Sequence, residues 1–231
     1  MSDDPEIPPE SDDGTPKVNE GLLDSPSTDV YRNINVLHMA FLIEGGMALL
    51  ALAIGYFGFY DKSQPLTSLG VSEWKAGLIW GIWGTIPLLV YLAVFHFYPP
   101  RFMDPMKRFV QNEMSPLFKR LNLIELMIVS LLAGFCEEIF FRWCLQGGIA
   151  CSIGGPTGMV IGLVIASVIF GACHWVNASY GITTTFVGLY LGLMMNWTGS
   201  FLAPAIAHTL FDFIALIYVA NMPIAAAEAE E

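Results

Sequence analysis

Six long hydrophobic stretches dominate this sequence of 231 residues, and each is close to the length that a helix needs to cross a lipid bilayer. About 20 apolar residues in an α-helix span the roughly 30 Å of hydrocarbon in a membrane. The chain is 13% charged, whereas soluble domains carry about 25% charged residues. The sequence therefore predicts an all-α, polytopic membrane helical bundle with about six transmembrane helices, at 36–60, 74–98, 121–148, 156–176, 180–197 and 199–221.

The excess negative charge of the chain lies at its two ends. Residues 1–30 contain nine acidic residues, one lysine and five prolines, and three of the last four residues are glutamates. Acidic, proline-rich segments with few apolar residues do not bury enough surface to fold. We therefore expect a disordered acidic arm over 1–30, a transmembrane helical domain over 31–223, and an acidic tail over 224–231.

Residues 101–122 separate the second and third hydrophobic stretches and contain five of the ten basic residues. Apolar residues recur there at helical spacing against lysines and arginines, which predicts an amphipathic helix at the membrane surface, interrupted near Pro116. Loops rich in lysine and arginine stay in the cytoplasm. With six spans, both termini are then expected in the cytoplasm as well.

The third stretch contains a charged motif, Glu137-Glu138-x-x-x-Arg142. Charged groups at membrane depth cost roughly 2.5–3.5 kcal/mol each and are rarely left unpaired. Glu138 and Arg142 are four residues apart, in the order that favours an ion pair on one helix face. Glu137 lies about 100° further round the helix. We therefore predict a structural Glu138–Arg142 ion pair and a Glu137 side chain that is free to face a cavity.

Two later stretches carry the remaining polar groups. His174 ends the fourth stretch, and the sixth contains His208 and Asp212 four residues apart, so that both emerge on one face. Taken singly, His174 reads as a hydrogen-bonded core residue and Asp212 as a group that fixes the tautomer of His208. Together with Glu137 they suggest one polar site inside the bundle. Glu44, His38 and His96 lie near the ends of their stretches and receive no role.

A converging set of Glu137, His174, His208 and Asp212 supports two kinds of hydrolysis. Glu137 can act as a general base toward water with His174 orienting it, while His208 and Asp212 stabilise an oxyanion. Glu137, His174 and His208 can instead hold a divalent metal such as zinc, which would polarise the water. The cofactor is therefore either none or a divalent metal, and the sequence leaves this open.

The three motifs occur in order on the third, fourth and sixth stretches, as Glu-Glu-x-x-x-Arg, Phe170-x-x-x-His174 and His208-x-x-x-Asp212. In this, residues 121–221 resemble the core of the CAAX-protease and bacteriocin-processing (CPBP, abortive-infection) family of intramembrane peptidases. The resemblance implies that Glu137 and His174 activate water and that His208 with Asp212 stabilises the oxyanion. The family has been described both as metallopeptidases and as glutamate-dependent peptidases. Where the prenyl-protein proteases have Asn, this chain has Asp212, which either carries a proton or orients His208.

The leading hypothesis is an intramembrane endopeptidase that acts on a membrane-associated or lipidated peptide, located in the bilayer of a bacterial inner (plasma) membrane. One alternative is a non-catalytic membrane protein that binds peptides or bacteriocins, or scaffolds other proteins, on the same fold. A proton-coupled transporter is a third hypothesis, although no inverted repeat is evident. The sequence has no phosphate-binding glycine loop and no basic stripe, so we expect neither nucleotide nor nucleic acid as a partner.

Overall fold

The computed structural model describes residues 35–56 and 71–223, and within these ranges the chain forms helices and turns without a β-strand. This confirms the predicted all-α class. The predicted arm over 1–30, the tail over 224–231 and the end of the first stretch lie outside the described residues. Along the chain the elements are α2 Val36–Ile54, α3 Val71–Phe97, η3 Arg101–Met103, α4 Asp104–Phe109, η4 Val110–Met114, α5 Ser115–Phe118, α6 Leu123–Leu132, η5 Ala133–Glu137, η6 Ile139–Gln146, α7 Gly147–Ile153, α8 Gly155–Cys173, α9 Ala178–Thr198 and α10 Leu202–Ala220.

Five helices in the described part of the chain are long and apolar enough to cross a membrane, namely α2, α3, α8, α9 and α10. They coincide with five of the six predicted stretches. Most of the large side chains on α2 and α3 are apolar and exposed, as expected where a helix faces lipid rather than water. The polytopic helical bundle predicted from the hydrophobic stretches is therefore confirmed.

The third predicted stretch is helical but is not one regular α-helix. From α6 to α7 the helical run is continuous, and the π-helical segments η5 and η6 interrupt it on either side of Glu138. A π-turn adds a residue to the helical turn, and such turns are frequent at functional sites. The charged residues of the Glu-Glu-x-x-x-Arg motif thus lie where the helix departs from regular α-helical geometry.

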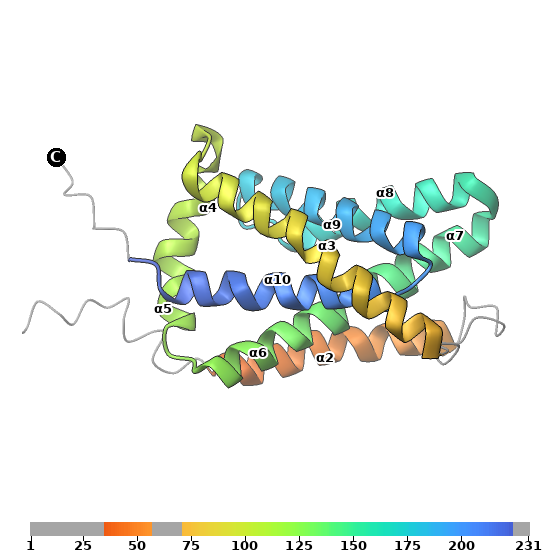
Figure 1. Cartoon of the computed structure of the whole chain (residues 1–231), viewed down its shortest axis with the longest axis horizontal. Helices are drawn as coiled ribbons and strands as arrows, with labels where there is room; N and C mark the ends of the chain where they lie inside the picture. Colours follow the sequence, from red (N-terminus) through yellow and green to blue (C-terminus); the bar gives the residue numbers. More distant parts are fainter. Residues whose placement is uncertain (1–34, 57–70, 224–231) are drawn as a thin grey trace, which may run out of the picture. The chain divides into compact units, whose positions relative to one another are not determined.

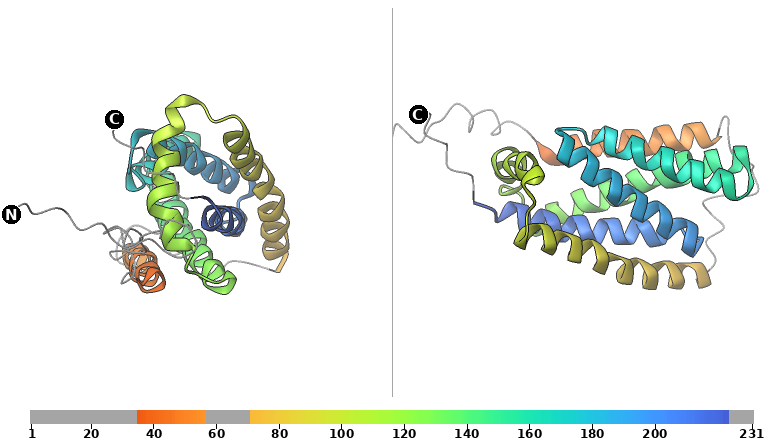
Figure 2. Two further views of the ribbon diagram at one scale, coloured as in Figure 1. Left: turned by 90° about the vertical axis from the view of Figure 1, so that its left-hand side faces the viewer. Right: turned by 90° about the horizontal axis from the view of Figure 1, so that it is seen from above.

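When the run from α6 to α7 is counted as one helix, successive long helices run in opposite directions, and α10 lies between the others (Figures 1 and 2). α10 packs against α3, α6, η5 and α9, and α8 packs against α9 and η6. Because α10 carries His208 and η5 ends at Glu137, this packing brings two of the three motifs face to face.

The segment from η3 to α5 crosses the end of α10 instead of running beside it (Figure 1). It occupies the region predicted as an interfacial helix, and Pro116 lies in the first turn of α5, directly after the π-helical η4. The hydroxyl of Ser115 donates to the carbonyl oxygen of Met222 at 3.2 Å, which ties this segment to the end of α10. This segment therefore covers one end of the helix that carries His208 and Asp212.

Side-chain caps and glycines define where the site-bearing helices begin and end. Asn122 and Glu125 form a capping box at the start of α6, in which the backbone N–H of Asn122 donates to Glu125 Oε2 at 2.8 Å. Glu125 is therefore a capping residue. Gly154 and Gly155 have φ of 78° and 60°, a backbone conformation that glycine adopts readily, at the sharp turn from α7 into α8. That turn sets the position of α8 and, at its far end, of His174.

Candidate active site

The predicted ion pair between Glu138 and Arg142 is present and fully buried. Arg142 Nε donates to Glu138 Oε2 at 2.8 Å, and neither side chain is exposed. The guanidinium carbon of Arg142 also lies 5.5 Å from the centre of the Phe170 ring, within range of a cation–π interaction. The pair thus joins η6 to α8 in the interior of the bundle.

His208 of α10 binds the same carboxylate from the other side. Its Nδ1 lies 3.1 Å from Glu138 Oε1. Because Arg142 keeps Glu138 ionised, this carboxylate can only accept, and His208 Nδ1 must carry the hydrogen. The other nitrogen, Nε2, then faces the remaining acids. The carboxylate that fixes the His208 ring is therefore Glu138, a contact between residues 70 positions apart in the sequence.

His174 is fixed by the backbone of its own helix. It lies just beyond the last turn of α8, and its Nδ1 donates to the carbonyl oxygen of Phe170 at 2.8 Å. A carbonyl only accepts, so Nε2 of neutral His174 is left as an acceptor. The His174 ring also packs on the Phe170 ring, with centroids 4.7 Å apart. Phe170, a member of the second motif, thus positions His174 through both its ring and its backbone.

Glu137 lies between the two histidines. Its Oε1 is 3.8 Å from His174 Nε2, and its Oε2 is 3.9 Å from His208 Nε2. Both distances are longer than a direct hydrogen bond. Glu137 Oε2 is buried and has no hydrogen-bond partner. The structure therefore brings together Glu137, His174 and His208, and Glu137 Oε2 keeps no direct hydrogen bond.

Asp212 completes the set at the edge of the site. Its Oδ2 lies 3.5 Å from His208 Nε2, one helical turn along α10. Its side chain is 26% exposed, as against 6% for His208. Asp212 thus faces the side of His208 that Glu138 does not occupy.

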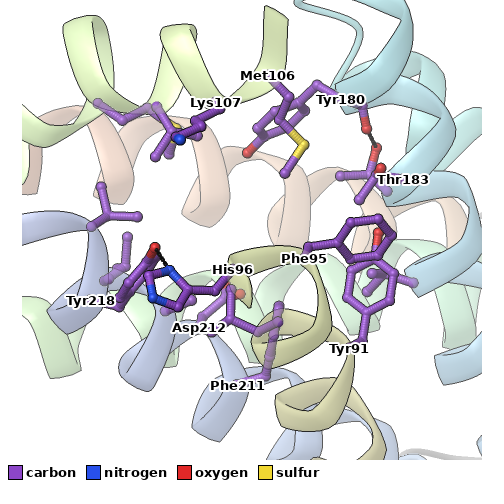
Figure 3. Close-up of a pocket in the computed structure, with 18 of the residues that line it drawn as sticks. Tyr91, Phe95, His96, Met106, Lys107, Tyr180, Thr183, Phe211, Asp212 and Tyr218 are labelled. Atoms are coloured by element: carbon purple, nitrogen blue, oxygen red, sulfur yellow. Dashed lines mark hydrogen bonds between the residues drawn. The ribbon is translucent and has the colours of Figure 1, made fainter. Parts of the chain in front are cut away.

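A cavity of about 760 Å³ opens onto this cluster, and Figure 3 shows part of its lining with Asp212. Apolar and aromatic side chains from α3, the crossing segment and α10 form much of its wall, among them Tyr91, Phe95, Met106 and Phe211. Glu137, His174, His208 and Asp212 all line the cavity, whereas Glu138 and Arg142 do not. Volumes of 300–1,000 Å³ with apolar walls and a few polar groups are typical of ligand sites.

A close helix crossing places η5 against α10. A Cβ added at Gly134 would lie 2.6 Å from the amide nitrogen and 2.8 Å from the Cα of Thr209, which is much closer than van der Waals contact. Only glycine therefore allows this approach, and it brings His208 within reach of Glu138. A glycine three residues before the motif was the available sequence signal for this crossing.

Another buried contact had no counterpart in the sequence predictions. The amide of Gln146 donates to Asn196 Oδ1 at 2.9 Å and to the carbonyl oxygen of Gly192 at 3.1 Å. This fixes the end of η6 against α9, one turn beyond Arg142. Its only sequence signal was an uncharged amide inside a hydrophobic stretch, which sequence patterns do not distinguish from a solvated one.

The donor types in the cluster suit zinc, which accepts imidazole nitrogen and carboxylate oxygen. In the described part of the chain, however, no group of three or more His, Cys, Asp or Glu side chains is arranged to hold a metal ion. Metal binding by Glu137, His174 and His208 therefore stays a prediction.

Comparison with known proteins adds to this geometry. No solved structure matches the chain. A Bacillus subtilis (strain 168) protein named "Uncharacterized protein YpbD" is 29% identical over 169 residues, which cover 71% of this chain and 79% of that protein. Residues 119–214 match the family model described as "Type II CAAX prenyl endopeptidase Rce1-like", and the match contains all three motifs. Over this segment, the chain is similar to the Rce1-like family of type II CAAX prenyl endopeptidases.

Proposed function

We propose that this protein is an intramembrane endopeptidase that hydrolyses a peptide bond of a membrane-associated or lipidated peptide. The observation that carries the proposal is the Glu137 carboxylate, which lies between two histidines with their Nε2 atoms at 3.8 and 3.9 Å and has no hydrogen bond to Oε2. The match of residues 119–214 to a CAAX endopeptidase family model and the cavity that opens onto these residues support it.

Glu137 is the general base in this proposal. Gaps of nearly 4 Å between polar atoms are wide enough for bridging by one water molecule. A water there is oriented by Glu137 Oε1 and by the acceptor Nε2 of His174. Its oxygen attacks the carbonyl carbon of the peptide while its proton passes to Glu137. When the C–N bond breaks, Glu137 gives this proton to the leaving amine, and the site returns to its starting state.

His208 stabilises the negative oxygen that forms on the attacked carbonyl. Because Nδ1 already donates to Glu138, His208 donates to an oxyanion only when Nε2 also carries a hydrogen, in the imidazolium form. Asp212, with Oδ2 at 3.5 Å from Nε2, then acts as a counter-ion and holds the ring in place. This is the orienting role for Asp212, and it does not require a protonated Asp212.

The substrate enters from the side of the crossing segment in this proposal. Basic loops remain in the cytoplasm, and residues 101–122, which include this segment, contain five of the ten basic residues of the chain. We therefore assign the end of the bundle with α4 and α5 to the cytoplasmic face. The cavity is lined by α4 and η4 as well as by Glu137, so a peptide at the cytoplasmic surface reaches the base through it.

The decisive experiment uses purified protein in liposomes with a prenylated peptide and the same peptide without its lipid. Wild type is expected to cleave the prenylated peptide, and Glu137→Gln is expected to lower kcat by about 10³-fold, within the 10²–10⁴ range of general-base catalysis. Asp104→Asn is the matched control, because Asp104 is exposed on α4 and does not line the cavity. Equal rates for wild type and Glu137→Gln would refute the proposal.

Two further measurements separate the alternatives. If a divalent metal takes part, a chelator abolishes cleavage and added zinc restores it, whereas a reaction that depends on Glu137 alone survives chelation. A cellular phenotype that wild type and His174→Ala rescue equally would identify a binding or scaffold protein instead of a peptidase.

A further inference from the structure

Glu44 is a half-buried acid that the proposed reaction does not use. It lies in the middle of α2, whose other residues are mostly apolar, and it is the only carboxylate of that helix. The sequence pattern had placed it near the end of a longer stretch. Its Oε2 is shielded from solvent and has no hydrogen-bond partner. An isolated carboxylate at this depth needs a partner or a proton.

Two buried carboxylate oxygens lack a partner in the described part of the chain, and they are Glu44 Oε2 and Glu137 Oε2. Of the other acids, Glu138 is paired with Arg142, Glu125 caps α6, and Asp212 lies 3.5 Å from His208. The two buried carboxylate oxygens without a hydrogen bond thus belong to one acid on α2 and one at the end of η5.

The packing of the helices brings these two acids into one neighbourhood. α2 packs against both η5 and η6. A Cβ at Gly55, just after α2, would overlap the Trp143 ring of η6, so the helix is closely seated there. Glu44 interacts electrostatically with Glu137, His208 and Asp212. α2 therefore presents its single carboxylate to the polar site and not to lipid.

The geometry points to Glu44 as a positioning residue that donates a hydrogen bond to Glu137 Oε2 through one water. A protonated carboxyl has one O–H donor, and an ionised Glu137 can only accept. Neither histidine is close enough to hold Glu137 by a direct hydrogen bond. A donor on α2 would keep the carboxylate between them. The inference rests on the proposed function only in treating Glu137 as the base.

The test compares variants of Glu44 that keep or lose a donor. Glu44→Leu keeps the size but loses the donor, and it is expected to lower kcat 10- to 100-fold with KM unchanged, the effect of removing one buried hydrogen bond. Glu44→Gln keeps an N–H donor without a charge and is expected to recover most of the lost activity. Full activity in Glu44→Leu would overturn the inference. So would a Glu44→Gln variant as impaired as Glu44→Leu, since Glu44 would then act through its charge.

A second readout does not depend on activity. Thermal unfolding in detergent of Glu44→Leu, Glu137→Leu and the double variant forms a double-mutant cycle. We expect the two changes in Tm to be clearly non-additive, and additive changes would overturn the inference. If wild type cleaves no peptide, the proposed function fails, yet the cycle still decides whether Glu44 and Glu137 are partners.

Discussion

Glu137 and Glu138 are neighbours in the sequence but differ in almost every physical respect. Glu138 is fully buried, paired with Arg142 at 2.8 Å and bound by His208 at 3.1 Å. Glu137 lines the cavity, has no neighbour within hydrogen-bond distance of Oε2, and lies nearly 4 Å from two imidazoles. One acid is satisfied by the protein, and the other is left for a substrate or a water.

The difference shows how one helix serves both structure and chemistry. The run from α6 to α7 turns Glu138 toward η6, α8 and α10, where a cation and a histidine neutralise it. Glu137 points to the cavity on the adjoining face. His208 contacts Glu138 through Nδ1 and faces Glu137 through Nε2. The buried pair of Glu138 and Arg142 therefore orients the ring that the reaction at Glu137 uses. We call Glu138 and Arg142 the buried side and Glu137 with the cavity the open side, and we expect the two to respond differently to mutation.

The largest effect on folding is expected from removing one partner of the buried pair. Glu138→Gln leaves Arg142 without its carboxylate, and an uncompensated buried charge costs about 3–5 kcal/mol. Denaturant titration in detergent micelles would measure the free energy of unfolding. Glu137→Gln serves as the contrast, and we expect it to change this free energy by less than about 1 kcal/mol, within the range of mild substitutions.

Replacing both partners sharpens the same comparison. Well-packed apolar residues in place of a buried ion pair are often neutral or stabilising. Glu138→Leu combined with Arg142→Met should therefore recover much of the stability that Glu138→Gln loses, while activity stays low because His208 has lost its acceptor. Recovery of activity along with stability would show that Glu138 does not orient His208.

A somewhat smaller effect is expected at the helix crossing that joins the two sides. Gly134→Ala forces η5 away from the backbone of Thr209 and should cost about 1–3 kcal/mol, the usual range for overpacking. Gly148→Ala is the matched control, because a Cβ there meets no atom within 4 Å and alanine favours a helix by up to about 1 kcal/mol. Thermal unfolding of both variants measures the contrast, and equal Tm values would mean that the crossing at Gly134 is not tight.

The sequence predicted the elements that depend on local pattern. Apolar length located α8 and α10 to within three residues at each end, and the four-residue spacing predicted the pair of Glu138 and Arg142. Both follow from the period of a helix and the dielectric of a bilayer, which a single sequence contains.

Contacts between segments that lie far apart in the sequence could not be predicted from local sequence patterns. The hydrogen bond from His208 to Glu138 depends on how closely α10 approaches η5 at Gly134, and no local pattern encodes a crossing distance. The π-turns around Glu138 depend likewise on the packing of α2, α8 and α10 against this run. For the same reason, Glu44 could not be placed beside the site from the sequence of α2 alone.

Asp212 lies at the edge of the site beside His208, and we expect its substitution to have the smallest effect on kcat. Its Oδ2 is 3.5 Å from His208 Nε2, a weak contact, and Glu138 fixes the ring independently. Asp212→Asn keeps the size and offers an amide that can itself donate to an oxyanion. We therefore expect kcat to fall by no more than about tenfold, equivalent to roughly 1.4 kcal/mol, with the free energy of unfolding unchanged. His208→Ala is the comparison in the same liposome assay, and its loss should be much larger. A loss of kcat in Asp212→Asn as large as that in Glu137→Gln would place Asp212 among the reacting groups, together with Glu137.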